Sequence, residues 1–160
     1  MRSNINAGIV AGLIAGLGFG IVMTVIHAPT PDGGSVPMMA MVAKVVGSTS
    51  LAIGWLYHLF NSMVIGGLFG WVLGDKIGGF GSGLGWGAGY GLVWWLLGGL
   101  ILMPVFLGMP AFAPLRMPMM RSVAFASLVG HLMFGLIVGA TFVLLRRTAT
   151  RAPLGGVRHA

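Results

Sequence analysis

Four long apolar runs, separated by short segments rich in glycine, proline and charge, make up most of this chain of 160 residues. The runs cover about residues 5–26, 50–73, 83–103 and 122–145. An α-helix rises about 1.5 Å per residue, so about 20 apolar residues cross the hydrocarbon core of a bilayer. The pattern therefore predicts an all-α integral membrane protein, a single membrane domain over residues 1–160 with four transmembrane helices.

The connections expected on the outer side of the membrane are irregular. Closely spaced prolines and glycines in residues 27–37 rule out a regular helix there. Residues 38–46 are apolar again and predict a short interfacial helix, with Pro37 in its first turn and Lys44 reaching the lipid head groups. The second outer connection, about residues 105–121, is again rich in proline and methionine.

The second half of the chain repeats the first. Each half, about residues 5–76 and 80–146, contains a glycine-rich run followed by a run centred on a histidine. Because each unit crosses the membrane twice, both copies have the same orientation, which predicts two tandem helical hairpins related by a pseudo-two-fold axis along the membrane normal. The repeated positions are Gly8, Gly12 and Gly16, which recur 75 residues later as Gly83, Gly87 and Gly91, and His58, which recurs 73 residues later as His131.

Small residues recur every four positions and therefore share one face of each predicted helix. In lipid, glycine and serine at this spacing let two helices approach closely, and packing drives their association. We expect these faces to hold the helices together. The set comprises Gly8, Gly12, Gly16, Gly20, Gly54, Ser62, Gly66, Gly83, Gly87, Gly91, Ser127, Gly135 and Gly139.

Composition and charge exclude several classes of protein. Hydrophobic residues make up 57% of the chain and charged residues 7%, with a mean hydropathy of +0.98, whereas soluble domains contain about 25% charged residues. The net charge of +7 does not indicate nucleic-acid binding, because no soluble surface remains to carry a basic patch.

The position of the basic residues predicts the orientation. If both termini are cytoplasmic, more lysine and arginine lies inside than outside, as the positive-inside rule requires, and we expect a multi-pass protein of the inner cell membrane. The tail over residues 146–160 is basic, and we expect it to be mobile. The inner residues are Arg2, Lys76, Arg146, Arg147, Arg151 and Arg158, and the outer residues are Lys44, Arg116 and Arg121.

Catalytic groups are scarce. The chain has no cysteine, which excludes disulfides, thiolate metal sites and cysteine nucleophiles. Asp32 and Asp75 are the only acids, and the predicted topology puts them on opposite sides of the membrane, where neither can orient a histidine inside it. We therefore expect a protein that is not an enzyme.

His58 and His131 are the only ionisable side chains inside the predicted transmembrane spans, and such groups are candidates for function. The repeat puts them at matched depth. Three roles remain open: hydrogen bonding between helices, ligation of haem b or a soft metal, or a path for protons or a small solute.

Methionines gather on the outer side. Thioether and imidazole ligands suit Cu(I), and the densest candidate group is His27 with Met117, Met119 and Met120. Methionine also fills irregular gaps beneath segments broken by proline. Both interpretations stay open.

Three motifs resemble an uncharacterised family of small four-span proteins of bacterial and archaeal inner membranes, related to the YagU-like proteins. They are Gly54-Trp55 with His58, His131-Leu132 with Phe134-Gly135 and Gly139, and Gly87 and Gly91 with Trp94-Trp95-Leu96 before Met103-Pro104. The resemblance covers about residues 5–145. It implies the four-span fold, with His58 and His131 as marker residues, and no activity.

The sequence thus leaves three functions. The first is an accessory or scaffold subunit of a larger membrane complex, surrounded by lipid and associated with other subunits or with further copies of itself. The second is a haem- or copper-binding protein that uses His58 and His131 for electron transfer or metal handling. The third is transport of a small solute between the two repeats.

Overall fold

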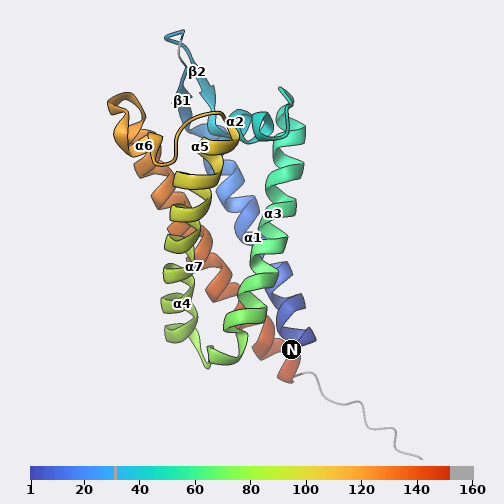
Figure 1. Cartoon of the computed structure of the whole chain (residues 1–160). Helices are drawn as coiled ribbons and strands as arrows, with labels where there is room; N and C mark the ends of the chain where they lie inside the picture. Colours follow the sequence, from blue (N-terminus) through green and yellow to red (C-terminus); the bar gives the residue numbers. More distant parts are fainter. Residues whose placement is uncertain (31, 152–160) are drawn as a thin grey trace, which may run out of the picture.

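The computed structural model describes residues 1–30 and 32–151, with side chains as far as Thr148. It is mostly helical, and four helical segments of the described chain are long and apolar enough to cross a membrane, as predicted. They run side by side (Figure 1). These segments are Arg2–Val25, Leu51–Lys76, Phe80–Phe106 and Pro118–Thr148.

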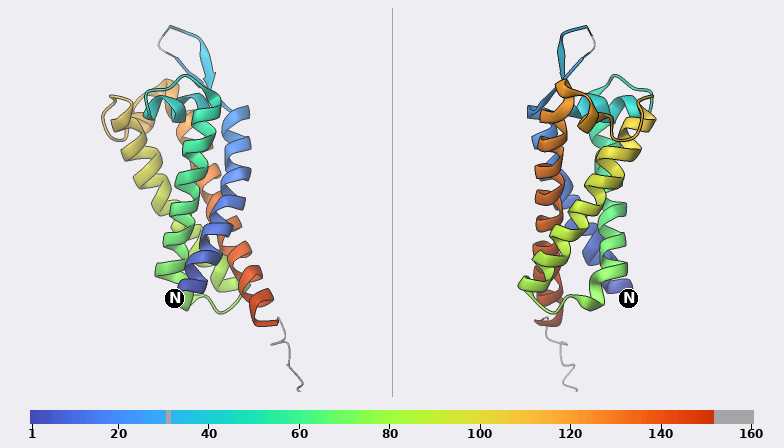
Figure 2. Two further views of the ribbon diagram at one scale, coloured as in Figure 1. Left: turned by 90° about the vertical axis from the view of Figure 1, so that its right-hand side faces the viewer. Right: turned by 60° about the vertical axis from the view of Figure 1, so that its left-hand side comes forward.

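Apart from η1, the short elements gather at one end of the bundle, opposite the N-terminus (Figure 2). In chain order the elements are α1 (Arg2–Val25), β1 (His27–Pro29), β2 (Ser35–Pro37), α2 (Met38–Val45), α3 (Leu51–Leu73), the 3-10 helix η1 (Gly74–Lys76), α4 (Phe80–Trp94), the π-helical segment η2 (Trp95–Leu102), α5 (Met103–Phe106), α6 (Ala113–Arg116), the 3-10 helix η3 (Pro118–Met120) and α7 (Arg121–Arg151).

Glycine contacts join α1 to α3. A Cβ atom at Gly12 would overlap the carbonyl oxygen of Ser62, and one at Gly8 would overlap that of Gly66. Gly16 lies against the Ser62 side chain, and Gly20 against the ring of Trp55. The two backbones can approach this closely only because these positions lack side chains.

The same kind of contact joins α4 to α7. Cβ atoms at Gly83, Gly87 and Gly91 would meet the carbonyl oxygens of Gly139, Gly135 and His131, respectively. Gly54 differs, because it accommodates α2: a Cβ atom there would lie 2.7 Å from the carbonyl oxygen of Met39. The predicted small faces therefore serve both helix pairs and the short helix above them.

The connection between α1 and α2 contains a structure that the sequence did not predict. Residues 27–37 were expected to be irregular, but β1 and β2 within this range are the strands of an antiparallel β-hairpin, in which His27 pairs with Pro37 and Pro29 with Ser35. Pro29 and Pro37 are tolerated because each strand has a free edge. Gly33, with φ of 84°, turns the chain between them. The expected short helix follows as α2.

The third long helix is not regular. It widens into η2 just before Pro104. Proline has no N–H, so an α-helix would leave the carbonyl of Leu100 without its usual donor. That carbonyl instead accepts a hydrogen bond from the N–H of Phe112, at 2.7 Å. The loop between α5 and α6 therefore provides the donor for the carbonyl that the proline leaves without one.

Polar contacts close the opposite end of the bundle. The Asn4 side chain donates to Asp75 at 2.7 Å, and Arg146 donates to the Gly74 carbonyl at 2.7 Å. α7 continues to Arg151, beyond the predicted end of the span at residue 145. Of the tail predicted over 146–160, residues 152–160 lie outside the described residues.

Replacing Gly87 with alanine should destabilise the protein. The added Cβ would overlap the Gly135 backbone, and such overpacking costs about 1–3 kcal/mol. Gly85→Ala is the matched control on the same helix, because a Cβ at Gly85 meets no atom of the described chain within 4 Å. Unfolding in detergent measures both, and equal stability of the two variants would contradict the proposed packing.

Candidate functional site

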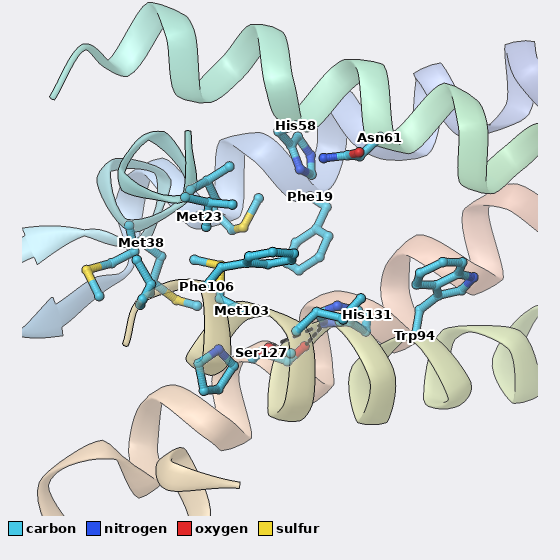
Figure 3. Close-up of a pocket in the computed structure, with 18 of the residues that line it drawn as sticks. Phe19, Met23, Met38, His58, Asn61, Trp94, Met103, Phe106, Ser127 and His131 are labelled. Carbon is cyan, nitrogen blue, oxygen red and sulfur yellow. Dashed lines mark hydrogen bonds between the residues drawn. The ribbon is translucent and has the colours of Figure 1, made fainter. Parts of the chain in front are cut away.

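A cavity of about 420 Å³ lies in the half of the bundle nearest α2 and α5. α3 lines one side of it, and the end of α4 with η2 and α5 lines the other. Figure 3 shows Phe19, His58 and His131 at its inner end, and Met38, Met103 and Phe106 toward the short elements. Its volume falls in the range of small-molecule sites, about 300–1,000 Å³.

His58 connects two helices. Its Nε2 lies 2.9 Å from the carbonyl oxygen of Gly16, so the ring of α3 donates a hydrogen bond to α1. The side chain is buried, and its own carbonyl accepts a hydrogen bond from the hydroxyl of Ser62 at 2.8 Å. In this arrangement His58 makes the interhelical hydrogen bond that was one of the three predicted roles.

His131 bonds differently. Its Nδ1 lies 2.7 Å from the carbonyl oxygen of Ser127, one turn earlier in the same helix, and 3.3 Å from the Ser127 hydroxyl. The other edge of the ring faces η2: a Cβ at Gly98 would lie 3.8 Å from Nε2. Within the described residues, His131 therefore donates to its own helix and not to a neighbouring one.

Phe19 of α1 separates the two histidines. Its ring centroid is 5.7 Å from that of His58 and 4.9 Å from that of His131, both in edge-to-face arrangement. A haem held between the two imidazoles would need the space that Phe19 occupies, and His58 would have to release Gly16. Haem binding through this pair stays a prediction.

The rest of the cavity wall is apolar and adaptable. No acid, lysine or arginine of the described chain lines it. Asn61 adds an amide and Ser127 a hydroxyl at the level of the histidines, and Tyr57 and Trp94 add aromatic rings. Sequence reasoning did not single out Tyr57 or Trp94 as part of a site. The methionines of the wall are Met23, Met38, Met41, Met103, Met109 and Met120.

The structure places the four candidate copper ligands in different settings. Met117 and Met119 are exposed, whereas Met120 is buried and lines the cavity. His27 is exposed in β1, and its Nδ1 bonds to the Val25 carbonyl at 2.9 Å. Among the described residues, no three His, Cys, Asp or Glu side chains are close enough together to hold a metal ion.

The two carboxylates lie away from the cavity. Asp75 is bonded to Asn4 at the opposite end of the bundle. Asp32 lies in the turn of the β-hairpin, where a hydrogen bond from the Thr30 side chain lowers its pKa. Neither lines the cavity, so the histidines have no acid partner there.

Comparison with known proteins found no match: no family model, no curated protein and no solved structure resembles the chain significantly.

Replacing each histidine with leucine should separate their structural roles. His58→Leu removes a bond between helices and should lower the free energy of unfolding by about 0.6–2 kcal/mol. His131→Leu removes a bond within one helix and should cost about half of that or less. Unfolding of both variants in the same detergent checks this, and an equal loss would refute the difference between the two side chains.

Proposed function

We propose that this chain is a non-enzymatic, multi-pass membrane protein that binds an amphipathic, membrane-soluble small molecule in the cavity between α3 and α4. The observation that carries the proposal is a cavity with largely apolar walls that both His58 and His131 line. Sites for small molecules combine these features, an apolar lining with a few placed polar groups. The absence of charge in the wall favours an uncharged ligand.

Access from the bilayer is part of this proposal. α1 packs closely on α3 and α7, and α4 on α7, but α3 and α4 approach each other at scarcely any position of the described chain. Closer to the end that contains the N-terminus, Tyr90 of α4 bridges the two helices: its hydroxyl donates a hydrogen bond to the Ile65 carbonyl of α3 at 2.7 Å. Above this bridge the cavity lies between the two helices, so a lipid-dissolved molecule could reach it sideways.

The repeat explains why the cavity lies between α3 and α4 and not between α1 and α7. We propose that the chain is a tandem duplication with a pseudo-two-fold axis, and the recurrence of the α1–α3 glycine contacts between α4 and α7 supports this. On the closed side of the bundle, where α1 meets α7, Phe19 packs directly on Gly130. The repeat-related positions on the open side are Trp94 and Tyr57, and both line the cavity. An aromatic ring in place of glycine holds α3 and α4 apart.

The charge distribution supports cytoplasmic termini in a cell membrane. Arg2, Lys76 and Arg146 lie at the end of the bundle that contains the N-terminus (Figure 1). Lys44 and Arg116 lie in α2 and α6, at the opposite end. This asymmetry follows the positive-inside rule.

Retention of a bound molecule tests the ligand-binding function. The protein is purified from membranes in mild detergent, and the extracted small molecules are identified by mass spectrometry. We expect a compound in near-stoichiometric amount with the wild type and a large loss with Gly98→Val, whose side chain projects beside Nε2 of His131. Gly89→Val is the control on the same helix, because a Cβ there meets no described atom within 4 Å.

The proposed function fails if the wild type retains no compound, or if Gly98→Val retains as much as Gly89→Val. Helix content and thermal unfolding of both variants establish that they are folded.

A subunit role is the second candidate, and a feature of α4 favours it. Besides the glycines that face α7, α4 has a second set, Gly81, Gly85 and Gly89, whose absent Cβ atoms would meet no other atom of the described chain within 4 Å. Spacing of this kind suits contact with another transmembrane helix. Gly85→Leu should then reduce recovery of a larger complex in native gels of gently solubilised membranes, whereas unchanged migration would argue against this role.

A further inference from the structure

We infer that the head group of the ligand is a neutral hydrogen-bond donor, a phenol or alcohol hydroxyl, whose single O–H donates to the free ring nitrogen of His131. The inference rests on the proposed ligand-binding function and specifies its chemistry. It follows from how the two imidazoles are already bonded.

Backbone carbonyls fix the tautomer of each histidine. A carbonyl oxygen can only accept a hydrogen bond, so the ring nitrogen that faces it must carry the hydrogen. Nε2 of His58 faces Gly16, and Nδ1 of His131 faces Ser127. A neutral imidazole has one N–H. The remaining nitrogens, Nδ1 of His58 and Nε2 of His131, are therefore acceptors.

These acceptors are open to the cavity. Neither nitrogen has a hydrogen-bond partner within the described chain, yet no fully buried side-chain nitrogen or oxygen of that chain lacks one. Both atoms must therefore be reachable from the cavity that their residues line. An acceptor left empty in apolar surroundings is costly, and a donor that arrives there restores the lost bond.

The space beside His131 suits a head group. Gly98 and Gly99 of η2 face its ring without side chains, and a Cβ at Gly99 would lie only 3.0 Å from the Ser127 hydroxyl. The widened η2 segment thus leaves a recess at the acceptor nitrogen. Next to His58, Asn61 contributes an amide to the same cavity (Figure 3).

Other head groups match these acceptors less well. At the ring nitrogen of His131, a ketone, ester or ether brings only lone pairs toward a lone pair. An ammonium group would enter a wall without a carboxylate. A cuprous ion would suit imidazole and thioether ligands, but Phe19 lies against both rings and keeps them from closing on one point. The methionines of the wall suit the apolar tail, since their flexible side chains adapt to its shape.

The test compares two probes that differ only in the donor: a long-chain alkylphenol and its methyl ether. Binding to the full-length protein in detergent is followed by quenching of tryptophan fluorescence, since Trp94 lines the cavity. We expect the wild type to prefer the phenol by several-fold to about tenfold, as one hydrogen bond provides. His131→Leu should remove most of this preference while still binding both probes. Gly98→Val should weaken both probes, and Gly89→Val neither.

The outcomes separate the two proposals. Equal affinity of the wild type for phenol and ether, with weaker binding in Gly98→Val, overturns the head-group inference and leaves the ligand-binding function standing. Failure of both probes to bind, in protein that also retains no native compound, overturns both. Stoichiometric Cu(I), measured by metal analysis and lost in His131→Leu, likewise overturns the hydroxyl inference.

Discussion

Contact between helix backbones is the constraint on which this bundle depends. In lipid, apolar side chains gain little by leaving one apolar environment for another, so close packing must hold the helices together. The contacts of Gly12 with Ser62 and of Gly87 with Gly135 fix two helix pairs at short distance. Once these pairs are fixed, the two remaining sides of the bundle are free to differ, and they do: α1 lies close to α7, whereas α3 and α4 stand apart.

The wider separation of α3 from α4 determines where the cavity lies, and the irregular backbone before Pro104 determines its shape. Ala11 and Ala15 of α1 are fully buried, whereas the positions 75 residues later are the larger Trp86 and Tyr90 of α4. Pro104 then prevents a regular end to the third long helix, and the resulting wide turn brings Gly98 beside His131. The proline thus shapes the recess beside His131 through the backbone of η2, although Pro104 itself lines another part of the cavity wall.

Features that depend on composition and on the spacing of residue types were predicted from the sequence. Features that depend on which individual residues contact each other were missed. Run lengths were enough for the four long helices, and four-residue spacing for the packing faces. The spacing did not predict that Gly54 packs against α2. A small residue indicates that another element comes close, but it does not identify that element. It could not predict the β-hairpin, whose strands are short and contain proline, or the π-helical turn, whose cause is one missing N–H. Nor could it predict Phe19 between the histidines, which depends on how α1 is rotated against α7.

The bonding of His131 to its own helix has a consequence for how this chain can change over time. His58 shares its hydrogen with another helix, so a substitution there alters how two helices meet. His131 hydrogen-bonds only to Ser127, one turn away on its own helix, so a substitution there breaks no hydrogen bond between helices of the described chain. Of the two histidines, His58 is thus constrained by the contact between α1 and α3. Selection can act on the chemistry of the His131 ring without breaking that contact.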